Sequence, residues 1–267
     1  LRRSRGLGDV YKRQGDDSVL VIDAQATPTL ARQVIQKVRS VTDKPISHLV
    51  LSHYHAVRVL GAAEYKASNI IMSSKARSMV VERGQEDWDS EFDRFPRLFK
   101  GHEEIPGLTW PTTTFDKKMS LFLGKRRVDL YFLGRAHTAG DIVIHVPDSN
   151  VLFTGDIVEY KSACYCGDAH LQDWPKTLGK IAKFQAVSLV PGRGDALTDP
   201  RQINDAIELT EDFVTSTFKS VSKIASAGGD LKEAMSSCRD ECDKKFSDYA
   251  IYAVSYTHLR AHETFAN

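Results

Sequence analysis

The sequence predicts one α/β sandwich domain, with its sheets inside and its helices outside. Two patterns support this class. In the first hundred residues, short apolar runs alternate with amphipathic segments of helical period, and between Thr112 and Phe153 short apolar runs follow one another across turn residues. The first pattern is typical of parallel strands joined by helices, and the second of an antiparallel meander. The expected order of elements is therefore βαβαβαα, then a β meander, then αβα.

The first half of the chain begins with a buried strand. Residues 18–23 form a continuous run rich in β-branched side chains, which is typical of a strand buried on both faces. Thr27 and Pro28 then open a helix, because a hydroxyl caps the first turn and proline fits its first position. The further elements expected here are a strand at 47–52, a helix at about 59–67, a strand at 69–72 and a charged helical stretch at 74–100 that breaks near Gly84.

The second half of the chain contains the meander and the long helices. Turns rich in glycine and aspartate separate its short apolar runs, which is the pattern of consecutive strands. The expected elements are strands at 119–123, 126–133, 142–146 and 150–154, a helix at 173–184, a strand at 188–190 and two long helices at 201–227 and 230–247.

Composition excludes several classes of protein. The chain is 42% hydrophobic and 27% charged, which is ordinary for a globular protein, and its net charge of +1 gives no footprint for nucleic acid or an anionic membrane. No apolar run approaches the roughly 20 residues that span a bilayer. We therefore expect a small-molecule substrate and neither a nucleic-acid nor a membrane partner. Four cysteines are too few for a disulfide framework, so a cytoplasmic or periplasmic location stays open, as does the oligomeric state.

Both ends of the chain look foreign to the domain. Residues 1–14 are strongly basic without apolar periodicity, and residues 254–267 resemble the translated adapter sequence found at the ends of assembled metagenomic reads. The alternative is a native basic arm and a frayed tail. We expect the domain to occupy 15–253, truncated at its N-terminus, with a signal peptide or one or two starting strands missing upstream.

Polar side chains that can bind a metal follow several of the expected strands. His53 and His55 end the strand at 47–52, and because residues at i and i+2 share one face of a strand, their rings would point together. His137 follows a later strand in the segment Gly-Arg-Ala-His-Thr-Ala-Gly-Asp, and Asp156 follows another in Phe-Thr-Gly-Asp. The turn Pro-Gly-Arg-Gly at 191–194 is a fifth element at a strand end.

These segments, spread over roughly residues 16–200, resemble the metallo-β-lactamase fold superfamily. The family pattern is a His-x-His-x-Asp-His run, a histidine in Gly-x-x-His-Thr-x-Gly, an aspartate in a Gly-Asp turn and a late histidine in Pro-Gly-His-Gly. The resemblance implies a four-layer αββα sandwich and a metal-dependent hydrolase. The superfamily acts on many substrates, and nothing in this sequence selects a β-lactam.

The resemblance also implies a role for each matching residue. His53, His55 and His137 correspond to the three histidines of the first zinc site, and Asp156 to the aspartate that bridges the two metals. Asp141 corresponds to a position that supports the site rather than binding the metal.

The residues specific to the second zinc site are all changed. Val57 replaces the aspartate, and Arg58 and Arg193 replace the two histidines. An arginine stays protonated in proteins and has no lone pair for a metal. Because the losses are confined to one site, we predict a site remodelled to hold a single zinc ion through the three histidines, with water or Asp156 in the remaining position.

The catalytic prediction assigns a role to four residues. Asp156 would accept a proton from the zinc-activated water or orient it, with Asp141 supporting the site. Arg58 and Arg193 would either bind an anionic group of the substrate or stabilise an oxyanion, or else pair with Asp156 and hold the turn together; both interpretations stay open. The expected substrate is a small, anionic ester or thioester. One alternative is a non-catalytic anion-binding protein with an idle or absent metal, and another is an iron redox enzyme.

A second cluster of cysteine, aspartate and histidine spans residues 164–170. Its spacing matches no usual zinc pattern, so we predict that Cys164 and Cys166 serve loop packing.

Overall fold

The structure is a computed structural model that describes residues 12–14 and 17–249. The chain divides into two compact units, one of Leu1–Phe132 with Ile142–Asn150 and the other of Leu133–Asp141 with Val151–Asn267. The described strands belong to two sheets, accompanied by helices, which confirms the α/β class. None of the described helices has both the length and the apolar character needed to cross a bilayer.

The first unit contains a sheet whose strands follow chain order. Strand β2 is buried along its whole length, as its β-branched run predicts. Strand β1 pairs with β2 in antiparallel orientation, whereas all later neighbours are parallel, so their carboxyl ends share one edge. The strands are β1 (Lys12–Gln14), β2 (Val19–Ile22), β3 (Ile46–Val50), β4 (Asn69–Ser73) and β5 (Thr113–Phe115).

Helix α1 (Pro28–Arg39) starts where its sequence signals predict. The Thr27 side chain accepts a hydrogen bond from the Leu30 backbone N–H, and Pro28 occupies the first helical position. This local chemistry needs no tertiary contact, which is why the start of the helix can be predicted from the sequence.

The helices after β3 differ from the expected ones. The helix predicted at 59–67 is two short pieces, α2 (Ala56–Val59) and η1 (Ala62–Tyr65), and α2 begins directly after His55. Helix α3 (Ser74–Arg94) is continuous, so the break predicted near Gly84 is wrong. Gly84 is buried within the helix, and a Cβ atom there would lie 3.4 Å from the Leu108 side chain, an ordinary packing contact. The helix ends before Pro96, which disfavours helical geometry in the preceding residue. Two short 3₁₀ turns follow, η2 (Pro96–Leu98) and η3 (His102–Glu104).

The predicted meander is present in the first unit. Strands β6 (Lys118–Leu123), β7 (Arg126–Tyr131) and β8 (Val143–Val146) pair in antiparallel fashion, in that order. The β6–β7 turn contains Gly124 at a φ of 65°, a conformation that glycine adopts without steric cost.

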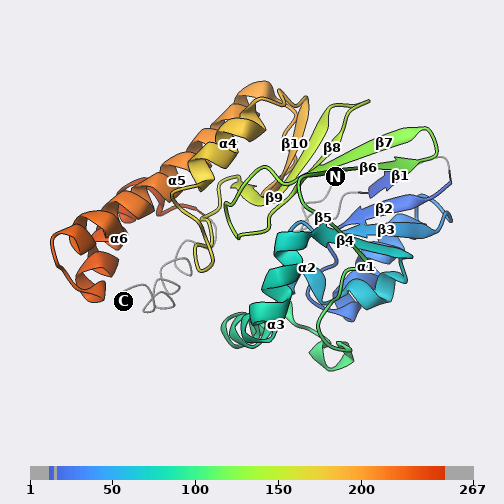
Figure 1. Ribbon diagram of the computed structural model, residues 1–267, viewed down its shortest axis with the longest axis horizontal. Helices are drawn as coiled ribbons and strands as arrows, with labels where there is room; N and C mark the ends of the chain where they lie inside the picture. Colours follow the sequence, from blue (N-terminus) through green and yellow to red (C-terminus); the bar gives the residue numbers. More distant parts are fainter. Residues whose placement is uncertain (1–11, 15–16, 250–267) are drawn as a thin grey trace. The chain divides into compact units, whose positions relative to one another are not determined.

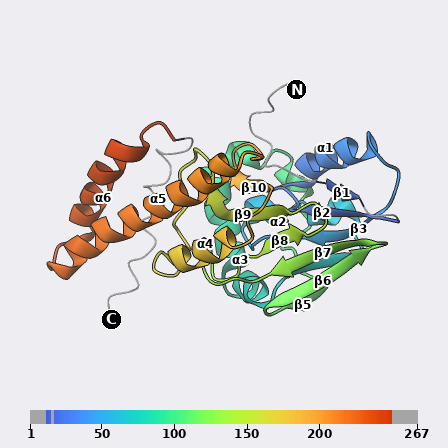
Figure 2. The ribbon, with the colours of Figure 1, turned by 90° about the horizontal axis from the view of Figure 1, so that it is seen from above.

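In its described part, the second unit combines two parallel strands with three helices. Helices α4 and α5 pack on β9, and α5 lies beside α6 (Figures 1 and 2). A capping box of Asp230 and Glu233 starts α6. The elements are β9 (Val151–Glu159), α4 (Trp174–Ala182), β10 (Ser188–Arg193), α5 (Pro200–Ser226) and α6 (Leu231–Phe246).

Strands β9 and β10 are both longer than predicted, because they continue to pair across two register shifts near Pro191. Asp156 and Arg193 therefore lie within strands rather than in the turns expected for them. Bulges of this kind are common next to functional sites, where they redirect side chains.

Strand β1 lies inside the segment 1–14 that we expected to be non-native. The origin of this segment stays a prediction. The tail expected at 254–267 lies outside the described residues.

Candidate metal centre

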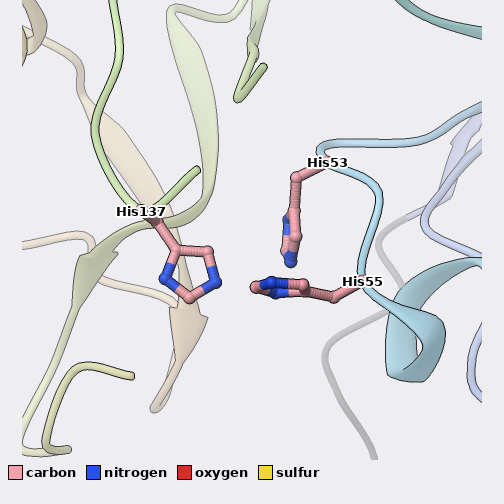
Figure 3. A group of neighbouring side chains, drawn as sticks. All are labelled: His53, His55 and His137. Atoms are coloured by element: carbon pink, nitrogen blue, oxygen red, sulfur yellow. The ribbon is translucent and has the colours of Figure 1, made fainter. Parts of the chain in front are cut away.

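Three buried histidines predicted as metal ligands come together in the structure. Each of His53, His55 and His137 offers one ring nitrogen, and these three nitrogens lie within 4.8 Å of one another. Figure 3 shows the three rings converging. Imidazole nitrogens are preferred ligands of zinc, and three protein ligands with one open position is its usual catalytic arrangement. The donor set therefore fits a metal ion.

His53 is oriented by a short hydrogen-bonded chain in the first unit. The Ser52 backbone N–H donates to Asp23 Oδ1 at 2.8 Å, and the Ser52 hydroxyl donates to Asp23 Oδ2 at 3.0 Å. Since the hydroxyl hydrogen is given to Asp23, Ser52 Oγ accepts from His53 Nδ1, which lies 2.9 Å away. This tautomer leaves the lone pair of His53 Nε2 for a metal.

The roles of Asp23 and Ser52 were not predicted from the sequence. The usable signal was local: an aspartate at the end of the first buried strand, and a serine immediately before the histidine at the end of the next parallel strand. The carboxyl ends of these neighbouring strands lie at one sheet edge, which brings the two residues together.

His55 is placed by contacts with helix α3. Its Nε2 lies 3.8 Å from Asp87 Oδ1, and the backbone N–H groups of the next two residues donate to carboxylates of the same helix, at Asp87 and Glu91. Both carboxylates are buried. Burial, followed by the neighbouring charge of Asp87, raises the pKa of Glu91 to about 7. Sequence reasoning missed both acids, because carboxylates four residues apart on a charged helix resemble a solvated face.

His137 is oriented by a backbone carbonyl in the second unit. Its Nδ1 donates to the carbonyl oxygen of Tyr165 at 3.0 Å, since a carbonyl can only accept. The lone pair of the ring is then on Nε2, and this atom lies 3.7 Å from Asp156 Oδ2. The predicted ligands His137 and Asp156 are therefore neighbours.

Asp141 holds the loop that carries His137. Its Oδ2 accepts from the Thr138 backbone N–H at 2.7 Å, and its Oδ1 accepts from the Thr138 hydroxyl at 2.7 Å. Both oxygens are thus engaged one residue beyond the histidine, as expected of a residue that supports a ligand.

Arg193 pairs with two buried carboxylates on β9. Its Nη1 lies 3.0 Å from Asp156 Oδ2, and the same nitrogen donates to Glu159. Of the two roles left open for this arginine, the structure shows the pairing with Asp156. Glu159 was missed, because the strand that carries it was expected to end at 154. Arg58, the other predicted arginine, is buried in α2, and its carbonyl accepts from the Ala24 backbone N–H.

The segment 164–170 contributes one further candidate. Cys164 and Cys166 are buried free thiols, in keeping with loop packing, and burial raises the pKa of both. Within the described part of the chain, His55, Asp87 and Asp168 form a second group whose ligand atoms lie within 4.8 Å of one another.

The sequence matches the model of a known protein family. The metallo-beta-lactamase superfamily model matches residues 6–181, more than half of the chain, so this protein belongs to that superfamily. The resemblance drawn from the sequence motifs is therefore confirmed. The match begins inside the segment 1–14.

Curated relatives carry the same family name. The chain is 27% identical over 205 residues to the metallo-beta-lactamase type 2 of Bacteroides fragilis, across 74% of this chain and 72% of that protein. It is 23% identical over 182 residues to the metallo-beta-lactamase type 2 of Bacillus cereus, across 66% of this chain and 63% of that protein. The chain thus spans less than two thirds of the Bacillus cereus relative.

Solved structures confirm the predicted fold class. A metallo-beta-lactamase from Pontibacter korlensis superposes with a TM-score of 0.61 at 18% identity, covering 78% of this chain and 87% of that one. The metallo-beta-lactamase IND-7 superposes with a TM-score of 0.61 at 19% identity, covering 78% and 86%. At these identities the likeness shows the fold alone.

Proposed function

We propose that this protein is a zinc-dependent hydrolase that holds a single zinc ion on His53, His55 and His137. The observation that carries the proposal is the convergence of the three histidine rings, and membership of the superfamily supports it. A zinc ion held by three protein ligands has an open position, where it lowers the pKa of a bound water to about 7 and polarises a substrate oxygen.

Neighbouring residues fix the tautomer and the ring orientation of two of these histidines in the metal-free protein. Ser52 Oγ accepts a hydrogen bond from His53 Nδ1, and the Tyr165 carbonyl accepts one from His137 Nδ1, so the lone pair of both rings is on Nε2. Preset tautomers and ring orientations reduce the cost of assembling a metal site.

Asp156 is the proposed proton acceptor and water-orienting group. It is buried, and its Oδ2 lies 3.7 Å from His137 Nε2 and 3.0 Å from Arg193 Nη1. If the three histidines held a zinc ion, a carboxylate fixed beside His137 in this way would serve to accept a proton from the activated water.

The proposed substrate is a small ester or thioester with an anionic group. Arg193 contributes little to this choice, because its charge is already balanced by Asp156 and Glu159. A role of Arg58 in binding the anionic group stays an expectation, and this residue is buried in α2. The balanced charge of Arg193 disfavours a purely anion-binding protein in which this arginine recognises the anion.

A panel of neutral and anionic esters and thioesters tests the activity. Zinc-loaded wild-type protein is expected to hydrolyse members of the panel, and His53→Ala to lose this turnover. Faster turnover of anionic than of matched neutral esters, reduced in Arg58→Ala, would support the substrate class. Absence of turnover across the panel, with anions bound in a titration, would favour the non-catalytic alternative. An iron-containing, coloured preparation would favour the redox enzyme.

A further inference from the structure

The first turn of α2 is held by two carboxylates from another helix. The Ala56 backbone N–H donates to Asp87 Oδ2 at 2.7 Å, and the Val57 backbone N–H donates to Glu91 Oε2 at 2.9 Å. Both acids lie on α3, which contacts α2 within the first unit (Figure 1), and both are buried. Burying a carboxylate destabilises the folded protein unless the group is hydrogen-bonded. The two N–H groups are therefore specific partners of Asp87 and Glu91.

This arrangement relieves His55 of a capping role. The first N–H groups of a helix need acceptors, which the N-cap side chain commonly supplies. His55 is the N-cap of α2, yet its side chain makes no capping hydrogen bond. Because α3 supplies the acceptors, the His55 ring can lie in the three-histidine group instead.

Asp87 also faces the His55 ring itself. Its Oδ1 lies 3.8 Å from Nε2, a charge contact that is too long for a hydrogen bond. With Nε2 on the carboxylate side, Nδ1 is the nitrogen that remains for a metal in the histidine group. A carboxylate next to the far nitrogen of a ligating histidine fixes the ring and makes it a stronger ligand.

We infer that Asp87, assisted by Glu91, is a positioning residue for the metal ligand His55. It supplies from α3 the negative charge that the family motif places two residues after this histidine, where this chain has Val57. The inference rests on the proposed function, because it requires a metal ion on the three histidines.

Two substitutions separate the charge of Asp87 from its hydrogen bond. Asp87→Asn keeps an oxygen for the Ala56 N–H but removes the charge, whereas Asp87→Ala removes both. Glu82→Gln, on an exposed position of the same helix, is the matched control. The readouts are the zinc dissociation constant from chelator competition, the zinc content per chain, the visible spectrum of the cobalt-substituted protein, and thermal unfolding of the metal-free protein.

The inference predicts that Asp87→Asn keeps one zinc per chain but binds it about 10- to 100-fold more weakly, with a changed cobalt spectrum. Glu82→Gln should match the wild type in every readout. An unchanged zinc dissociation constant in Asp87→Asn, with only thermal unfolding affected, would show a purely structural role and overturn the inference while leaving the proposed function intact.

Two further outcomes are informative. If the wild type binds two zinc ions and both Asp87→Asn and Asp168→Asn lose one of them, Asp87 is itself a ligand in the second group, and the positioning role is overturned. If folded wild-type protein binds no zinc, the proposed function and this inference fall together.

Discussion

Arg193 Nη1 lies 3.0 Å from Asp156 Oδ2 and also pairs with Glu159, so one guanidinium serves two buried carboxylates. The positive charge of Arg193 is thereby used within the protein. In the family motif a histidine for the second zinc occupies this position, and here the arginine holds the carboxylate that the second metal would have contacted. This pair is the clearest structural reason to expect a remodelled site.

Removal of Arg193 should destabilise the fold. In Arg193→Ala, Asp156 and Glu159 would stay buried without this guanidinium, and breaking a buried pair in this way typically costs about 3–5 kcal/mol. We expect a loss of about 3 kcal/mol in the free energy of unfolding, measured by urea denaturation at neutral pH. Arg201→Ala is the control, because Arg201 is 89% exposed beside Asp199 and should change stability by less than about 0.5 kcal/mol. Equal effects of the two substitutions would contradict this account of Arg193.

Gly192 should not tolerate a side chain. A Cβ atom there would lie 2.7 Å from the Asp156 backbone nitrogen, so Gly192→Ala must displace Asp156 or its strand. Overpacking of this kind costs about 1–3 kcal/mol. Gly179→Ala in α4 is the matched control, since a Cβ at Gly179 meets nothing within 4 Å and should stabilise the helix by about 0.5–1 kcal/mol. Thermal denaturation of both variants measures the difference in stability. An unchanged stability of Gly192→Ala would contradict this account, because it would show that the strand shifts without cost.

Ser52 should matter for metal binding through His53. In Ser52→Ala, His53 Nδ1 loses its acceptor and Asp23 loses a donor, so zinc affinity should fall about 10- to 100-fold. Chelator competition measures the change. Ser47→Ala is a close control, because Ser47 Oγ contacts the ring of the next residue, His48, in the same way at 2.7 Å, but His48 is no predicted ligand. A similar affinity loss in both variants would argue against the orienting role of Ser52.

Asp129 should contribute to stability at acid pH. Burial alone would raise its pKa, but hydrogen bonds from Arg127 and Ser120 outweigh this and hold the pKa below its usual value. The carboxylate therefore stabilises the fold above the pKa of the unfolded chain, and this contribution is lost as pH falls through the lower, folded-state pKa. The stability difference between wild type and Asp129→Asn should shrink as pH is lowered below about 4. Urea unfolding at several pH values measures it, and a difference that grows toward acid pH would contradict the assignment.

The predictable parts of the structure were those fixed by local chemistry. Thr27 and Pro28 supply the local signals for the start of α1. The family motif identifies His53, His55 and His137, but β3 ends at Val50, so His53 and His55 converge from the turn before α2 and not through the alternation of a strand. These signals lie within a few residues, so they can be read without knowledge of the fold.

The missed residues depend on contacts between distant segments. Asp87 and Glu91 are buried only because α3 packs against the turn after His55, more than 30 residues earlier. Glu159 lies within β9 because this strand continues to pair with β10 beyond the register shifts. Neither long-range contact has a local signature, so charged residues at these positions look like ordinary surface residues in the sequence.

Zinc content per chain tests the central claim most directly. Purified wild-type protein, dialysed against zinc-free buffer, and the His53→Ala variant are analysed by inductively coupled plasma mass spectrometry. The account predicts one tightly bound zinc in the wild type and its loss in His53→Ala, with the variant still folded by circular dichroism. Two tightly bound zinc ions in the wild type, or one that persists in His53→Ala, would contradict it.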